Sequence, residues 1–241
     1  MAKRAFLALV RDGDRSDGEP SGDGSRTLIE RSYERLRDDI VEGRLGPGEK
    51  LRVEHLKARY EVGAGTLREA IARLASDALV VAEGQRGFRV APMSLADLED
   101  LTRLRLHIEI DALRRSIRQG DAAWRARLQR AYDELSAFEQ PVRPDRRASW
   151  EDRNTRFHEA LIDACGSPWT MKALRLLGRH SERYRRQAIG LTDANRDVHA
   201  EHRQIFEAAM SGQEVRAALA LEAHIRATPD LLARARDATR T

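Results

Sequence analysis

The sequence is poor in cysteine and contains no long hydrophobic run. Cys165 is the single cysteine among 241 residues, so the chain cannot form an internal disulfide, which suits a reducing compartment. No apolar stretch approaches the roughly 20 residues that a membrane-spanning helix needs. The apolar residues 5–10 are too few for the core of a signal peptide. We therefore expect a cytoplasmic protein without a membrane span.

The chain also lacks a strong excess of charge of either sign. Its formal net charge is +4, and residues 27–92 contain 12 Lys and Arg against 11 Asp and Glu. A large basic excess is the usual electrostatic sign of a nucleic-acid-binding protein. Because this sign is absent, any contact with DNA has to be argued from the positions of individual cations.

The first 26 residues differ in composition from the rest of the chain. They are rich in Asp, Gly, Ser and Arg, with little apolar content after Val10. A segment of this kind cannot bury enough apolar surface to fold. We predict a disordered tail over residues 1–26.

Residues 27–92 show the pattern of three short helices followed by a hairpin. Apolar residues recur at spacings of three and four within residues 33–40, 53–60 and 67–78. Gly63-Ala64-Gly65 forms a turn before the third segment, and the β-prone runs 80–82 and 88–90 enclose a Gly-rich turn. This order predicts a winged helix-turn-helix, in which a helix enters the DNA major groove and a β-wing touches the backbone or minor groove. An unrelated three-helix bundle with a hairpin is the alternative.

From residue 94 onward the pattern is helical throughout. Ser94 and Asp97 resemble a capping box that opens the first segment. The six helical segments run over 94–118, 121–139, 146–164, 168–188, 193–211 and 213–237. We predict a mainly α protein with a winged helix-turn-helix domain at 27–92 and an all-α bundle of six to seven helices at 94–237.

Four polar residues in the second half have a spacing that could bind a metal ion. Asn154 and His158 lie four apart on one helical face, whereas His202 and His224 belong to two later helices. Three imidazoles and one amide oxygen could surround a divalent cation and leave positions open for water or a ligand. Histidines scattered on amphipathic helices are more often surface or hydrogen-bonded core residues, and this alternative stays open on the residues alone.

Two groups of cations are candidates for binding anions. Lys50, Arg52, Arg68, Arg86 and Arg89 could contact DNA phosphates, or could lie on an ordinary solvated face. A second group of cations lies on one basic helix. We favour the interpretation that these side chains form a solvated face with salt bridges; the alternative is that one arginine turns inward to bind a carboxylate. This group comprises Arg179, His180, Arg183, Arg185 and Arg186.

Residues 41–92 resemble the N-terminal domain of the GntR family of bacterial transcription regulators. The matching segments are 40–51, Leu67-Arg68-Glu69-Ala70-Ile71 and Arg86-Gly87-Phe88-Arg89-Val90. Residues 62–70 are most similar to the branch containing the carbon-starvation-induced regulator. The resemblance implies a DNA contact by Arg68, and we add Thr66, Arg86 and Gly87 from the matched segments. Most family members place Ser-Arg-Thr where this chain has Gly63-Ala64-Gly65, so the helix tip lacks its usual base-reading arginine.

Residues 95 to about 228 resemble the ligand-binding domain of the FadR-type branch, the FCD domain. The matching motifs are Arg105 with Glu109, Asn154-x-x-Phe157-His158-x-x-Leu161, Glu201-His202-x-x-Ile205 and His224-Ile225. The resemblance implies a divalent metal, Zn²⁺ or else Ni²⁺ or Mn²⁺, held by Asn154, His158, His202 and His224. It also implies a small carboxylate effector that reaches the metal or Arg105. Asn154 replaces a common aspartate, which should lower metal affinity and leave the full +2 charge to attract an anion.

We therefore predict a homodimeric transcription repressor that binds a palindromic double-stranded DNA operator. A small carboxylate, for example a dicarboxylate, is expected to release it from the DNA. The dimer follows from operator geometry, because two half-sites need two recognition helices. Two alternatives remain: a metal-responsive regulator without an organic effector, and a metal-dependent hydrolase. The hydrolase lacks any His-Glu-x-x-His motif to support it.

Overall fold

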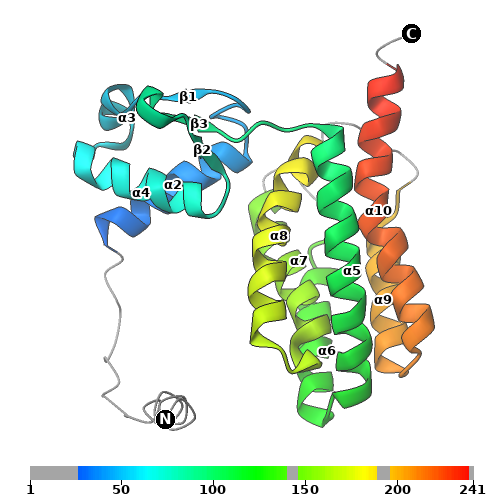
Figure 1. Ribbon diagram of the computed structural model, residues 1–241. Helices are drawn as coiled ribbons and strands as arrows, with labels where there is room; N and C mark the ends of the chain where they lie inside the picture. The colour runs from blue at the N-terminus through cyan, green and yellow to red at the C-terminus, as the bar shows by residue number, and fades with distance from the viewer. Residues whose placement is uncertain (1–26, 140–145, 189–195, 239–241) are drawn as a thin grey trace, which may run out of the picture.

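The protein is mainly α-helical, as predicted. The computed structural model describes residues 27–139, 146–188 and 196–238, and Figure 1 shows a small N-terminal module beside one end of a bundle of long helices. The tail predicted for residues 1–26 lies outside the described residues. Within them, no helix is long and apolar enough to cross a membrane.

The N-terminal module has the elements of a winged helix-turn-helix. Its helices are α2 (Leu28–Val41), α3 (Val53–Tyr60) and α4 (Ala64–Ser76), and the wing strands are β2 (Val80–Ala82) and β3 (Phe88–Val90). A further strand, β1 (Lys50–Leu51), pairs antiparallel with β3, so the sheet order is β1-β3-β2. The sequence did not predict β1, because two residues are too short to show alternation.

The apolar stripe of α4 packs against α2 in a core of its own. Leu67, Ile71 and Leu74 are fully buried and contact Leu36 of α2. Two details of the prediction are wrong. Ala78 is exposed, because α4 has ended at Ser76 and Ala78 has a φ of 56°. The predicted Gly63–Gly65 turn is shorter, because Gly63 is the N-cap and the following two residues already belong to α4.

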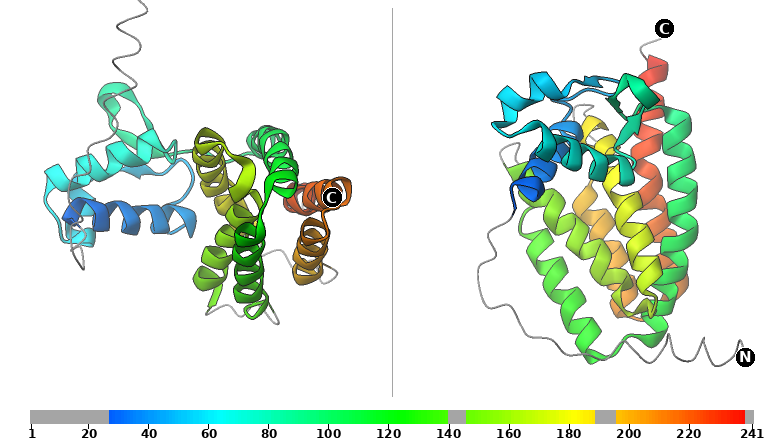
Figure 2. Two further views of the ribbon diagram at one scale, coloured as in Figure 1. Left: turned by 90° about the horizontal axis from the view of Figure 1, so that it is seen from below. Right: turned by 60° about the vertical axis from the view of Figure 1, so that its left-hand side comes forward.

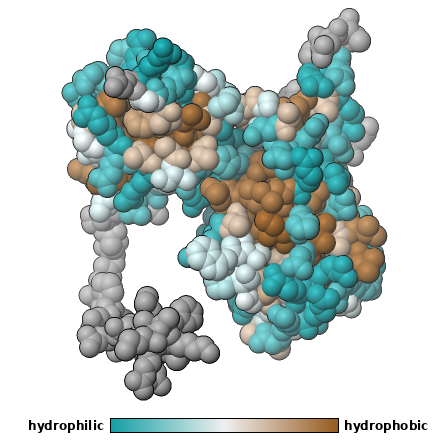
Figure 3. All heavy atoms as spheres, in the orientation of Figure 1, coloured by the Kyte–Doolittle hydropathy of each residue, from teal (hydrophilic) through white to brown (hydrophobic). Residues whose placement is uncertain are grey.

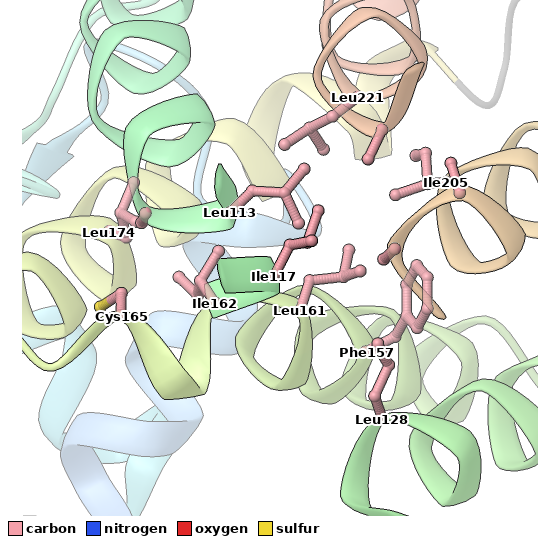
Figure 4. Close-up of a cluster of buried hydrophobic side chains, with 14 of the residues drawn as sticks. Leu113, Ile117, Leu128, Phe157, Leu161, Ile162, Cys165, Leu174, Ile205 and Leu221 are labelled. Carbon is pink, nitrogen blue, oxygen red and sulfur yellow. The ribbon is translucent and has the colours of Figure 1, made fainter. Parts of the chain in front are cut away.

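The second unit, here called the helical domain, consists of six helices in the described residues. They are α5 (Leu95–Gln119), α6 (Ala122–Ser136), α7 (Arg147–Ile162), α8 (Pro168–Ala188), α9 (Val198–Met210) and α10 (Glu214–Ala238). Side chains from all six helices meet in one apolar core, drawn in Figure 4. The core includes Leu113, Leu128, Phe157, Ile205 and Leu221, each of them fully buried.

The start of α5 differs from the predicted capping box. Ser94 caps the helix, since its hydroxyl accepts a hydrogen bond from the Asp97 backbone N–H at 3.1 Å. The carboxylate of Asp97 does not return to Ser94, and instead accepts a hydrogen bond from the Tyr184 hydroxyl at 2.6 Å. The second half of the box therefore links α5 to α8.

Helix α8 of the helical domain contacts the N-terminal module (Figure 2). Arg179 forms an ion pair with Asp77 at 3.0 Å, and the backbone oxygen of Asp77 lies 2.8 Å from the His180 ring. Glu182 pairs with Arg37 of α2 at 2.7 Å. The basic face of α8 is therefore largely an interdomain contact, a use that the sequence did not suggest.

Candidate effector site and DNA-contacting surface

Three buried histidines meet inside the helical domain. His158 comes from α7, His202 from α9 and His224 from α10, and one nitrogen of each ring lies within 4.8 Å of the others. Residues far apart in the sequence are thus brought to one point. Three imidazoles at this separation match the ligand set of a divalent metal ion.

Each of these imidazoles is oriented by a carboxylate at its Nδ1 atom. The pairs are Glu109 with His158 at 3.1 Å, Glu139 with His202 at 2.7 Å, and Glu201 with His224 at 2.7 Å. Because an ionised carboxylate only accepts hydrogen bonds, Nδ1 carries the proton and Nε2 keeps its lone pair. Metal-binding histidines are commonly held in this way, with the second nitrogen donating to a carboxylate.

Burial keeps His158 and His224 neutral. It lowers the pKa of His158 to about 4, against the pull of Glu109, and it lowers the pKa of His224 well below its usual value. Burial would raise the pKa of Glu109, but Arg105 and His158 outweigh it and hold that pKa at about 2. At neutral pH, His158 and His224 are therefore neutral and Glu109 is ionised, which is the protonation state that metal ligands and their supporting carboxylates require.

A cavity of about 260 Å³ adjoins this cluster. Asn154, His158 and His224 line it, whereas His202 is fully buried and does not line it. Among the described residues, neither Asn154 Oδ1 nor His202 Nε2 has a hydrogen-bond partner, although both atoms are buried. Buried polar atoms normally have a partner. Each of these two atoms has a lone pair without a hydrogen-bond partner. Together with the other two imidazoles, they fit a cation bound between them.

Three arginines line the same cavity, and each is held by a carboxylate. Arg105 binds Glu109 at 2.7 Å, Arg185 binds Glu151 at 2.8 Å, and Arg196 binds Glu201 at 3.0 Å. Arg105 was predicted at this site. Arg185 is the inward-turned member of the basic helix, which the sequence analysis did not favour. Arg196 and Glu139 were missed because neither belongs to a recognisable motif.

A second cavity of about 230 Å³ shares part of this lining. Asn154, His158, Arg105 and Arg185 border both cavities, so they lie between them. The second cavity also reaches Glu182 and its partner Arg37, which belongs to the N-terminal module. A continuous set of side chains thus connects the histidine cluster to the interdomain contact.

The candidate DNA-contacting residues lie on the N-terminal module. Lys50, Arg52, Arg68 and Arg86 are exposed, and their side chains form no hydrogen bond or ion pair with another described residue. Arg68 and the half-buried Thr66 lie in the first turns of α4. In the wing, Gly87 has a φ of 93°, which favours glycine, and Arg86 precedes it. Arg89 differs, because it binds Glu83 at 2.7 Å and the Gly48 carbonyl at 3.0 Å, and so braces the wing.

Comparison with known protein families gives two matches along the chain. Residues 28–90 match the model for bacterial regulatory proteins of the gntR family. Residues 100–227 match the model for the FCD domain. The two matches together include both the N-terminal module and the histidine cluster.

Several transcription regulators are similar to this chain over most of their length. The HTH-type transcriptional regulator BphR of Paraburkholderia xenovorans (strain LB400) is 42% identical over 93% of this chain and 94% of its own. The HTH-type transcriptional repressor GlaR of Escherichia coli (strain K12) is 30% identical over 80% of this chain and 90% of its own. Among solved structures, E. coli McbR/YncC has the same fold, with a TM-score of 0.69 at 17% identity, over 86% of this chain and 98% of that one.

Proposed function

Because the chain belongs to the GntR family of bacterial regulatory proteins and carries an FCD domain, we propose that it is a metal-containing, homodimeric repressor that a small carboxylate releases from DNA. The coarser statement, a DNA-binding regulator that responds to a ligand, follows from the family. The relatives are regulators and not enzymes, so the hydrolase alternative is set aside. We also propose a cytoplasmic location, because the chromosome of a bacterium lies in the cytoplasm.

The proposed metal ligands are Asn154, His158, His202 and His224. The observation that carries the proposal is that all three imidazoles direct Nδ1 at a carboxylate, which leaves Nε2 available as a ligand atom. Three nitrogens and an amide oxygen suit Zn²⁺, with Ni²⁺ and Mn²⁺ as alternatives. When bound, the ion supplies a positive charge that attracts an anion.

The proposed effector is a small carboxylate, because the cavity beside the cluster is bordered by cations. Arg105, Arg185 and Arg196 each have donors already used by a carboxylate, and a guanidinium has five N–H donors in all. An arriving carboxylate can therefore share an arginine without removing its present partner. Arginines on more than one helix suit a dicarboxylate, with one end near the metal and the other end at Arg105.

Coupling to the N-terminal module would pass through α8. Arg185 of this helix borders the effector cavity, and Glu182, one turn earlier, holds Arg37 of α2. An effector carboxylate that shares Arg185 with Glu151 would pull on this arginine and shift the helix that carries Glu182 and Arg179. The two recognition helices of the dimer would then no longer match the half-site spacing of a palindrome. A coupling of about 1–3 kcal/mol changes operator affinity about 5- to 150-fold.

The repressor assignment is supported by the relative GlaR, which is itself a transcriptional repressor. In the proposed complex, Arg68 and Thr66 of α4 contact the major groove, while Arg86 and Gly87 place the wing on the DNA. Lys50 and Arg52 supply further contacts to the phosphate backbone. The alternative of a metal-responsive regulator uses the same site, with the ion itself as the signal.

A titration of operator binding separates these possibilities. The purified full chain would be freed of metal by chelation, then given Zn²⁺, a series of mono- and dicarboxylates, or both, while operator binding is followed by fluorescence anisotropy. We expect release from DNA only when a carboxylate is present with the metal. Release by Zn²⁺ alone would favour the metal-responsive alternative. Equal carboxylate affinity before and after chelation would contradict the role of the metal and leave Arg105 as the anchor.

A further inference from the structure

One face of α5 carries an exposed stripe, here called the α5 stripe. Its members recur at helical spacings of three and four residues and line a shallow hollow on the surface. They are Asp100, Arg103, Leu104, His107, Ile110, Asp111 and Arg114. Leu104 is 47% exposed, and Figure 3 shows hydrophobic residues gathered over the middle of α5 and the adjoining part of α8. The stripe thus has Leu104, His107 and the half-buried Ile110 between charged ends, and most of it is open to solvent in the single chain.

Residues at equal distances on the two sides of the centre of the α5 stripe have either opposite charges or matching apolar side chains. His107 is the middle residue of the 25-residue helix. Asp100 and Arg114 lie seven residues to either side of it, with opposite charges, and Arg103 and Asp111 lie four residues to either side, again with opposite charges. Three residues from the centre, both positions are apolar, Leu104 and Ile110.

We infer that the α5 stripe is the dimer interface, in which two copies of this chain pack α5 against α5 in antiparallel orientation about a two-fold axis at His107. Asp100 then lies level with the partner's Arg114, and Arg103 with the partner's Asp111. The two-fold axis repeats both contacts, and Leu104 lies level with the partner's Ile110. A parallel pairing would instead place each charge opposite an identical one. The inference rests on the homodimer of the proposed function and names its surface.

The charged members of the stripe are free to change partners. Asp100 and Arg103 pair with each other at 2.5 Å, but both side chains are 75% exposed. Asp111 pairs with Arg115 at 3.0 Å, and Arg114 lies 3.5 Å from Glu214 of α10. Solvent-exposed ion pairs are weak, so exchanging or sharing them across an interface costs little. Opposite charges across an interface chiefly select the orientation of the two partners.

Charge exchange tests the pairing on the full chain. The variants are Arg103→Asp, Asp111→Arg and the double exchange, with sedimentation velocity over a range of concentrations as the measurement. Each single variant places like charges opposite each other twice per dimer, so we expect its dimer dissociation constant to rise about tenfold or more. The double variant restores both contacts, so we expect it to return to within about threefold of wild type, which is under 1 kcal/mol. Arg216→Asp on the exposed part of α10 is the matched control and should leave association unchanged.

A crosslink tests the position of the two-fold axis. His107→Cys places two thiols at the axis, so oxidation or a short bismaleimide should join the subunits. The native Cys165 is 2% exposed and does not compete. Leu219→Cys, at a residue 63% exposed on α10, is the control and should stay monomeric on a denaturing gel.

The outcomes distinguish this inference from the proposed function. A wild-type chain that stays monomeric, alone and on operator DNA, would contradict the homodimer itself. A wild-type dimer unaffected by either single exchange, or crosslinked through Leu219→Cys and not through His107→Cys, would overturn the α5 interface and leave the homodimer standing. Thermal melts of each variant show whether the helix is preserved.

Discussion

In the N-terminal module the cations proposed for DNA stand in solvent, whereas the arginines at the effector cavity are each held by a carboxylate. Among the described residues, Arg68 and Arg86 form no side-chain hydrogen bond or ion pair, but Arg105 and Arg185 are bound to Glu109 and Glu151 at less than 3 Å. The difference matches the two ligands. DNA brings a dense row of phosphates that can order loose side chains, whereas a small effector gains affinity from groups that are positioned beforehand.

The largest effect should come from removing one histidine of the buried cluster. His202→Ala removes an imidazole that is fully buried, and we expect the purified protein to lose its metal. His199→Ala is a matched control, because His199 also contacts Glu139, at 3.3 Å, but lies outside the cluster. Elemental analysis measures the metal content of both, and circular dichroism checks the fold. A full complement of metal in His202→Ala would remove this residue from the ligand set.

The second largest effect is expected at acidic pH, which should destabilise the helical domain but not the N-terminal module. In the metal-free protein, the pKa of His158 is lowered from 6.5 to about 4, so the unfolded chain takes up a proton that the folded chain refuses. Stability of the helical domain should therefore fall as pH drops from 6.5 to 4. The pKa of Glu109, lowered from 4.5 to about 2, extends this loss below pH 4.5. In the N-terminal module the pKa of Tyr33 is raised to about 12 by burial, which has no consequence in this range.

Intrinsic fluorescence can measure this difference. All three tryptophans, Trp124, Trp150 and Trp169, belong to the helical domain. Urea titrations of the chelated protein at pH 7 and pH 5, followed by tryptophan emission, thus report on that domain alone. Hydrogen exchange of α2 and α4 reports on the N-terminal module. Equal destabilisation of both regions at pH 5 would contradict the assignment of the acid effect to the histidine cluster.

The sequence predicted the N-terminal module better than the site in the helical domain. Leu67, Ile71 and Leu74 repeat with the period of a helix, so the order of three helices and a hairpin could be read directly. The helices of the bundle followed from the same periodicity. Strand β1 was not predicted, because two residues are too few to show a periodic pattern. The ends of α4 were predicted wrongly, because Gly63 and Ala78 can either end or extend a helix.

The contacts that organise the site depend on tertiary structure, which no local pattern contains. Asn154 and His158 share a helical face, and that much was visible. The carboxylate of Glu139 reaches His202 across 63 positions, and Arg179 meets Asp77 across 102. The family resemblance named the expected ligand residues but gave no indication of Arg196, Glu139 or the interdomain use of α8. Such contacts require the arrangement of helices to be known.

A moderate effect is expected at the tip of α4. Arg68→Ala should weaken operator binding by about 1–3 kcal/mol, because it removes a base or phosphate contact from a helix whose preceding Gly63-Ala64-Gly65 has no long side chain. Arg73→Ala, on the same helix and 52% exposed, is the matched control. Anisotropy titrations at fixed salt measure both. Equal affinities for the two variants would remove Arg68 from the interface. Arg86→Ala should relax sequence preference as much as Arg68→Ala, in a binding-site selection.

A smaller effect, of opposite sign for the two ligands, should follow from Asn154→Asp. The new carboxylate should tighten metal binding by at least about 1 kcal/mol, and should weaken binding of a carboxylate effector by partly neutralising the ion. Operator affinity without effector should not change, since Asn154 lies in the helical domain. Calorimetry with Zn²⁺, then with the effector, measures both. Tighter binding of both ligands would show that the effector does not sense the charge of the metal.

Arg37→Ala should cause the smallest change in stability, but it should weaken the coupling between effector binding and operator binding. This ion pair with Glu182 is partly exposed, so its loss should cost at most about 1 kcal/mol of stability. It is also a direct link between α2 and the helix that borders the effector cavity, so its loss should reduce the coupling between effector and operator by about 0.5–2 kcal/mol. Arg127→Ala is the matched control, because Arg127 pairs with Asp163 at 2.7 Å within the helical domain. Operator titrations with and without effector give the coupling for each variant. Both changes delete an ion pair that joins two separate elements. An equal loss of coupling would therefore mean that α8 does not carry the signal through Arg37, and the contact of Arg179 with Asp77 would become the remaining route.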